Sequence, residues 1–346
     1  MRSEIKLKLA DALSVTGVLP LLRKLSPATG GLILALHRVL PRDEKYLSYD
    51  EHMVLAQTAF EDLLIHLRQH YEPVSLDTMF HTPRSESKRQ RVALTFDDGW
   101  TDTFGYAYPL LLRYEVPATV FVCTSLLGTS QLLPEERISR IYQFCVARKC
   151  TNLLESDLAN WGVPHASARG YTNVKQFLKQ MPLITKLTLI SHLEAAYGVP
   201  RDGVTRFMNW EEIEVMTRGG IQFGSHTANH ATLTGEQQSV MVQELCSSRD
   251  VLELHTGVAP RYLSYPNGKY NELVMQLAAE AGYTHGLTTK HGFYNPSRSS
   301  FAIPRIAIDD TIVTDANDRL HAGRTSLHFS RLWNTYQALT SQLRRL

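Results

Sequence analysis

The chain has few cysteines and little net charge, and both shortages narrow the range of functions. Its 346 residues include four cysteines, none of them in a Cys-x-x-Cys or zinc-finger spacing. Few, scattered cysteines are typical of a reducing compartment. A disulfide between Cys145 and Cys150 is the alternative that the sequence does not decide. The formal net charge of +2 gives no reason to expect a nucleic acid as partner.

Long hydrophobic runs and internal repeats are also missing. The apolar run at residues 15–22 is followed by Arg23 and Lys24 instead of the small-residue cleavage site of an export signal. The run at residues 31–36 is too short to cross a bilayer. We expect residues 5–25 to form an amphipathic helix that closes the bottom of the domain, and attachment of this helix to a membrane is the alternative. We also expect the protein to be cytoplasmic.

What the sequence does contain is an acid pair at the end of an apolar, β-prone run. Residues 92–96 (VALTF) predict a buried strand, and Asp97, Asp98 and Gly99 follow at once. Carboxylates in such a place are costly unless they are hydrogen-bonded, paired or bound to a cation. Gly99 lets the chain leave the strand there, so that both acids can face one site. An ordinary polar turn with a helix cap is the alternative.

A histidine pair further along the chain completes the pattern. The β-prone run at residues 221–225 leads directly into His226, and His230 follows it at a spacing of four. If a helical turn begins there, this spacing places both imidazoles on one face. Two imidazoles and one carboxylate suit zinc with a position left for water. We therefore assign Asp98, His226 and His230 as ligands of Zn²⁺ or another divalent transition metal, with two hydrogen-bonded histidines near a helix start as the alternative.

Residues 95–99 (TFDDG) together with residues 225–230 (SHTANH) resemble the polysaccharide deacetylase family, the NodB-like carbohydrate esterases. The resemblance runs from about residue 37 to residue 305. It implies an irregular (β/α) barrel, hydrolysis of N-acetyl groups from an N-acetylhexosamine-containing polysaccharide or glycan precursor, and Asp97 as general base. An O-acetyl esterase or de-N-formylase acting on a lipid-linked sugar, and a non-catalytic glycan-binding relative, are the alternatives.

Residues 262–268 (YLSYPNG) are similar to the family's third motif, a wall of the substrate groove. This similarity implies that the backbone N–H of Tyr265 lies near the reacting oxygen. The residues that we expect to bind substrate are Tyr265, Pro266, Asn267 and Trp100.

The chain departs from the family pattern at Ser264, where many members carry an arginine that pairs with the catalytic aspartate. A serine cannot supply that charge. We expect Arg305 to replace it against Asp97, because Arg305 opens a late strand, and Arg261 is the alternative. A surface ion pair is the other explanation for either arginine.

The proton donor has three candidates. The family's late motif often supplies a histidine flanked by apolar residues, which here implies His285 or His291. His37 follows the expected first strand and is the third candidate, with a role in the core as its alternative.

Strand and helix patterns alternate along most of the chain, which favours a parallel sheet or barrel with its chemistry at the carboxyl ends of the strands. We expect an N-terminal helix in residues 1–30, the barrel in residues 31–310 and a helical tail in residues 311–346. Helical patterns at residues 138–146, 172–178 and 183–196 interrupt the alternation and predict an insertion at about residues 128–205. This insertion could pack on the barrel, cover the groove as a lid, form a homodimer surface or bind a partner.

Overall fold

The structure is a computed structural model that describes residues 30–48, 50–83, 89–163, 170–200, 206–330 and 333. The helix expected at residues 5–25 and most of the expected C-terminal helix lie outside these residues. Within the described part of the chain, no helix is both long enough and apolar enough to span a bilayer.

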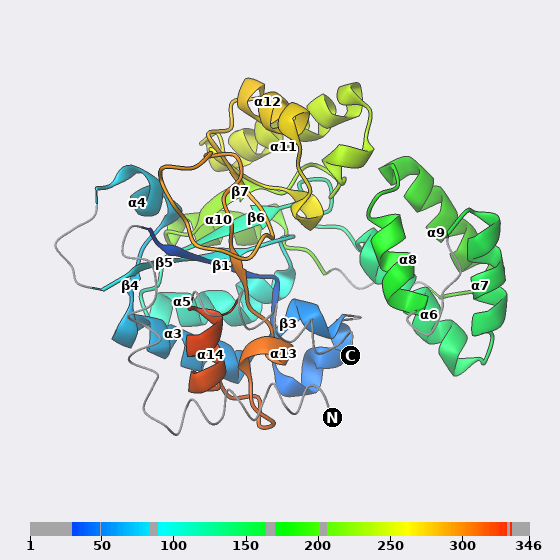
Figure 1. Cartoon of the computed structure of the whole chain (residues 1–346), viewed down its shortest axis with the longest axis horizontal. Helices are drawn as coiled ribbons and strands as arrows, with labels where there is room; N and C mark the ends of the chain where they lie inside the picture. Colours follow the sequence, from blue (N-terminus) through cyan, green and yellow to red (C-terminus); the bar gives the residue numbers. More distant parts are fainter. Residues whose placement is uncertain are drawn as a thin grey trace.

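A parallel sheet forms the centre of the molecule, and helices cover its outer face (Figure 1). Its order is β10 (Ile306–Ala307), β1 (Leu32–Leu36), β5 (Arg91–Phe96), β6 (Ala118–Val122), β7 (Gln222–Ser225), β8 (Tyr262–Ser264) and β9 (His285–Leu287), with β4 (Glu72–Pro73) paired to β5. A separate parallel pair is formed by β2 (Arg38–Leu40) and β3 (Val54–Ala56).

One late segment joins the two edges of this sheet. Ile303 bridges Leu287 at the end of β9, and Ile306 pairs with Leu34 of β1 only three residues later. The sheet is thereby closed into an irregular barrel, which confirms the expected fold class.

Successive side chains along each strand enter two different apolar layers, because the side chains of a pleated strand point alternately to its two faces. Leu32 and Leu34 of β1 pack in the outer layer, together with Leu63 and Leu67 of α3 (Gln57–His70). Ile33 instead packs inside the barrel. The other helices around the barrel are α4 (Leu76–His81), α5 (Tyr108–Arg113), α10 (Trp210–Arg218), α11 (Gln238–Thr256), α12 (Glu272–Glu280), α13 (Asp310–Val313) and α14 (Ala322–His328).

Helix α4 closes the end of the barrel where the strands begin. The first residues of several strands contact it: Arg91 of β5 donates to the carbonyl oxygens of Thr78 and Thr82, and Gln222 of β7 donates to Asp77. Residues 73–76 (PVSL) resemble a short strand in sequence, but β4 ends at Pro73. Ser75 caps α4 by accepting a hydrogen bond from the backbone N–H of Thr78, at 3.1 Å.

Four helices between β6 and the return to the sheet form a group that we call the helical insertion: α6 (Pro134–Ala147), α7 (Thr151–Asn160), α8 (Gly170–Leu178) and α9 (Leu183–Tyr197). They share an apolar core of their own that includes Ile141, Leu189 and Leu193. Figure 1 shows the group beside the barrel, away from α4. The sequence patterns predicted α6, α8 and α9 but not α7. Cys145 and Cys150 in this group are free thiols.

Candidate metal centre and active site

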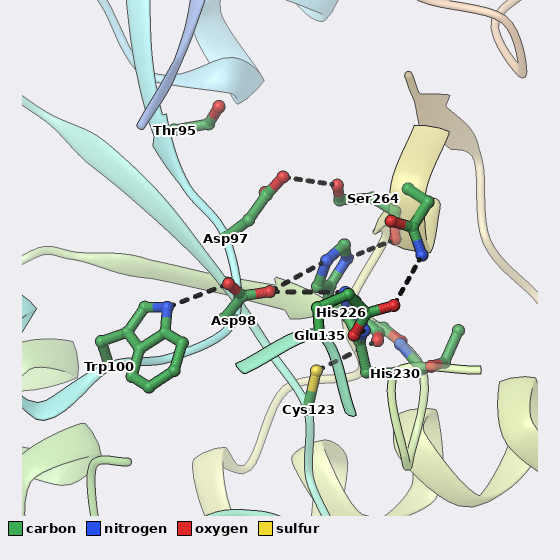
Figure 2. Close-up of polar contacts among 12 residues, drawn as sticks. Thr95, Asp97, Asp98, Trp100, Cys123, Glu135, His226, His230 and Ser264 are labelled. Carbon is green, nitrogen blue, oxygen red and sulfur yellow. Dashed lines mark hydrogen bonds and ion pairs between the residues drawn. The ribbon is translucent and has the colours of Figure 1, made fainter. Parts of the chain in front are cut away.

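The two sequence motifs meet at the carboxyl ends of β5 and β7 (Figure 2). One ligand atom from each of Asp98, His226 and His230 can be chosen so that all three lie within 4.8 Å of one another. The Nε2 atom of His226 is 3.3 Å from Oδ1 of Asp98, and Nε2 of His230 is 3.6 Å from the same oxygen. All three side chains are buried. This is the grouping that the sequence suggested.

The backbone reaches this arrangement through conformations that residues other than glycine rarely adopt. Asp98 has φ +74°, Thr227 +65° and His230 +58°, all in the left-handed region. The helical turn expected at His226 is therefore wrong: residues 226–230 form a non-helical loop that folds the second imidazole back toward the first. Their ring centroids are 5.0 Å apart. Non-glycine residues held at positive φ cluster at functional sites.

Two of the three ligand side chains, Asp98 and His226, are oriented by a further hydrogen bond. Trp100 donates from Nε1 to Oδ2 of Asp98 at 2.9 Å, which leaves Oδ1 facing the histidines. The carbonyl oxygen of Ser264 lies 2.7 Å from Nδ1 of His226. A carbonyl can only accept, so Nδ1 carries the proton and Nε2 offers its lone pair. Such support is typical of metal-ligating histidine, and the donor set fits a divalent metal.

The charges of the site also favour a cation. Burial alone would raise the pKa of Asp98, but its interactions with His226 and His230 outweigh burial and lower it. Burial would likewise lower the pKa of His226, but Asp97 and Asp98 outweigh it and raise it. The same negative charge would favour a bound cation.

Arg305 lies against Asp97, where the sequence analysis expected it. Its guanidinium donates to both carboxylate oxygens, at 2.8 and 2.6 Å, and is 1% exposed. Ser264 joins the pair by donating to Asp97 at 3.2 Å and accepting from Arg305 at 2.9 Å. Burial opposes ionisation of Asp97, but Arg305 and His226 outweigh it and hold its pKa well below the ordinary value.

Arg261, the alternative to Arg305, is at the opposite end of the barrel. It precedes β8 and pairs with Asp77 of α4. Its guanidinium therefore points away from the acid pair, and its side chain is 48% exposed.

The three proton-donor candidates separate in the structure. His285 is at the first residue of β9 and stacks on Phe80 of α4, with ring centroids 4.2 Å apart, so it lies at the amino end of the sheet. His291 packs on His328 of α14, with ring centroids 5.0 Å apart. His37 directly follows Leu36, whose carbonyl oxygen accepts from the N–H of Asp97 at 2.9 Å. Among these candidates, His37 is the one beside the acid pair, and it remains partly exposed.

Two expected substrate contacts are contradicted. The backbone N–H of Tyr265 donates to the carbonyl oxygen of Leu287 at 3.0 Å, because the β8–β9 ladder continues there, and so it does not face a reacting oxygen. Trp100 is 0% exposed and stacks on Phe207, with centroids 4.5 Å apart. It supports Asp98 from behind and cannot line a groove.

The other two residues of that set flank the centre. Pro266 is buried. Asn267, at φ +56°, donates from Nδ2 to Oγ1 of Thr232 at 3.0 Å. Its side chain therefore holds the loop that follows His230.

The sequence analysis missed Glu135, in the first turn of α6. Its Oε2 lies 3.6 Å from Nδ1 of His230, and its Oε1 lies 3.6 Å from Nζ of Lys186 in α9. No motif marks these residues, because they come from the insertion and reach the centre only through its fold.

Comparison with known proteins relates the chain to a family of deacetylases. Residues 84–152 and 162–286 match the sequence model of the polysaccharide deacetylase family, which is more than half of the chain. The putative polysaccharide deacetylase YxkH of Bacillus subtilis is 22% identical over 217 residues, which are 63% of this chain and 51% of YxkH, so the chain spans about half the length of that relative. Poly-beta-1,6-N-acetyl-D-glucosamine N-deacetylase of Staphylococcus aureus is 19% identical over 74% of this chain and 68% of its own.

Solved structures share the fold. Deacetylase PplD of Streptococcus pyogenes, in complex with acetate, superposes with a TM-score of 0.54 at 20% identity and covers 83% of this chain and 95% of its own. IcaB of Ammonifex degensii superposes with a TM-score of 0.55 at 16% identity and covers 87% and 97%. Given the extent of the family match and the barrel common to these structures, the chain belongs to the polysaccharide deacetylase family.

Proposed function

We propose that the protein is a metal-dependent hydrolase that removes N-acetyl groups from an N-acetylhexosamine-containing polysaccharide. The observation that carries this proposal is the convergence of Asp98, His226 and His230 beside a buried, ion-paired Asp97. The substrate class is supported by the relative from Staphylococcus aureus, whose name specifies N-deacetylation of a β-1,6-linked N-acetylglucosamine polymer.

Asp98 Oδ1 and the Nε2 atoms of the two histidines would hold the metal, and this donor set favours Zn²⁺. When bound, such an ion supplies Lewis acidity and lowers the pKa of a coordinated water toward neutrality.

The chain's own residues would move the protons. Amide hydrolysis forms a bond from water oxygen to the acetyl carbon and breaks the carbon–nitrogen bond. Asp97 is ionised at neutral pH and held by Arg305, so its carboxylate can take the proton that the attacking water loses. His37, beside it and partly exposed, is our candidate to give a proton to the departing amine.

The test combines zinc analysis with acetate release from β-1,6-linked N-acetylglucosamine oligosaccharides. We expect bound zinc and acetate release by the unaltered protein. Asp97→Asn should retain zinc and lose about 100-fold or more in turnover, because a general base contributes roughly 10² to 10⁴. His226→Ala should lose both zinc and turnover.

Full activity of Asp97→Asn would remove the assignment of Asp97 as base. O-acetylated oligosaccharides serve as the comparison substrate. Acetate released from these alone would replace the N-deacetylase proposal by an esterase.

A further inference from the structure

The helical insertion reaches the metal centre through Glu135. This residue lies in the first turn of α6, and Figure 2 shows its carboxylate next to His230. Oε2 of Glu135 and Nδ1 of His230 are 3.6 Å apart, within ion-pair range. A helix N-terminus favours a carboxylate in its ionised form. The insertion therefore places a negative charge against the back of one ligand imidazole.

The two ligand histidines differ in what supports them. Nδ1 of His226 contacts the carbonyl oxygen of Ser264 at 2.7 Å, so the barrel itself orients this ring. His230 ends a loop in which it and Thr227 both have positive φ, and its Nδ1 faces Glu135. An acceptor at Nδ1 favours the tautomer whose Nε2 lone pair points toward Asp98. The barrel thus orients one imidazole and the insertion orients the other.

Glu135 has a buried counter-charge within the same insertion. Lys186 of α9 is 1% exposed, and its Nζ lies 3.6 Å from Oε1 of Glu135. Glu135 Oε2, Lys186 Nζ and His230 Nδ1 are buried and have no hydrogen-bond partner among the described residues. Oε2 of Glu135 contacts His230, whereas Oε1 contacts Lys186 and accepts a hydrogen bond from Nδ2 of Asn267 at 3.5 Å. Because α6 and α9 pack together, the lysine can fix where the carboxylate stands.

We propose that Glu135 is a positioning residue for the metal centre: its carboxylate, 3.6 Å behind Nδ1 of His230, attracts the proton on Nδ1 and so keeps the Nε2 lone pair toward the divalent metal, while Lys186 holds Glu135 in place. The proposal rests on the proposed function in taking Asp98, His226 and His230 as metal ligands. It makes the insertion part of the metal centre.

The test is the Zn²⁺ affinity of the full chain, measured by competition with a chromophoric chelator. Partners behind a ligand histidine contribute about 10- to 100-fold to metal affinity. Glu135→Gln should therefore bind Zn²⁺ about 10- to 100-fold more weakly. Glu155→Gln is the matched control, since it removes the same charge from α7, which Figure 1 shows on the side of the insertion away from the barrel. Its affinity should equal that of the unaltered protein.

A double variant separates positioning from folding. Glu135→Gln leaves Lys186 buried without its counter-charge, which could disturb the insertion by itself. The combination of Glu135→Gln with Lys186→Met removes both charges. We expect this double variant to melt near the temperature of the unaltered protein and still to bind Zn²⁺ weakly. Recovery of full affinity in the double variant would overturn the proposal, because the loss would then come from the unpaired lysine.

The same titrations distinguish this proposal from the proposed function. Stoichiometric Zn²⁺ binding by the unaltered protein with unchanged affinity in Glu135→Gln would overturn the positioning role alone. An unaltered protein that binds no Zn²⁺ would overturn both.

Discussion

At the scale of single residues, Arg305 and Ser264 share the support of Asp97. Ser264, within the third motif, stands where the family resemblance led us to expect an arginine. A guanidinium from the segment that closes the barrel donates to both oxygens of Asp97 instead, and Ser264 hydrogen-bonds to both partners. The positive charge beside Asp97 thus comes from the residue that precedes β10.

Removal of this guanidinium should affect both activity and stability. In Arg305→Met, Asp97 would remain buried without its ion-pair partner, and breaking a buried pair from one side costs about 3–5 kcal/mol. We expect a lower melting temperature and loss of deacetylation. Arg261→Met is the matched control, because that arginine is 48% exposed at the far end of the barrel, and it should retain activity. Retained activity and an unchanged melting temperature in Arg305→Met would show that Asp97 does not depend on Arg305.

At the scale of elements, the strands were predictable because parallel strands buried on both faces are nearly continuous apolar runs. The acid pair and the histidines were found because each follows such a run. The helical turn at residues 226–230 was wrong, because two backbone conformations at positive φ override the helical spacing, and no residue type signals them. Helix α7 was missed because its sequence, TNLLESDLAN, is short and only weakly amphipathic.

Element packing also explains why His285 was a misleading candidate. It begins β9 and stacks on Phe80 of α4, where burial and nearby His81 lower its pKa to about 4. The unfolded chain takes up this proton at a pH near 6.5. The folded state therefore loses stability relative to the unfolded state as the pH falls from about 6.5 to about 4.

His285→Phe should retain deacetylase activity and unfold less readily in acid. The phenyl ring can keep the stack on Phe80 and has no proton to take up. Thermal melts of both proteins at several pH values between 4 and 7 would check this, with the difference growing toward low pH. Loss of acetate release with an unchanged melting temperature at neutral pH would return His285 to the list of proton donors.

At the scale of the whole molecule, the insertion and the barrel meet through buried charges. Glu136, next to Glu135 in α6, lies 3.7 Å from Arg38 of β2, and Arg38 also donates to Asp102 at 2.7 Å. Burial raises the pKa of Glu136 to about 7, against the opposing effects of Arg38 and Arg206. The sequence could not predict this contact, because it depends on how two independently packed cores are placed against each other.

Glu136→Gln should therefore stabilise the protein in a pH-dependent way. The folded pKa lies above the unfolded value near 4.5, so the folded state binds the extra proton, and stability falls as the pH rises from about 4.5 to about 7. A glutamine does not titrate and removes this loss, which amounts to about 3 kcal/mol. Denaturant unfolding at pH 5 and pH 8 would measure it. A gain of equal size at both pH values would contradict the assignment.

Closure of the barrel by the segment from Ile303 to Ala307 has a consequence for synthesis of the chain. Asp97 and Arg305 are separated by 208 positions, and the histidines are translated long before the arginine. A nascent or truncated polypeptide that stops before Arg305 contains Asp98, His226 and His230, yet its Asp97 has no counter-ion and its sheet is still open. Catalytic competence therefore arrives late in translation, with the strand that seals the fold.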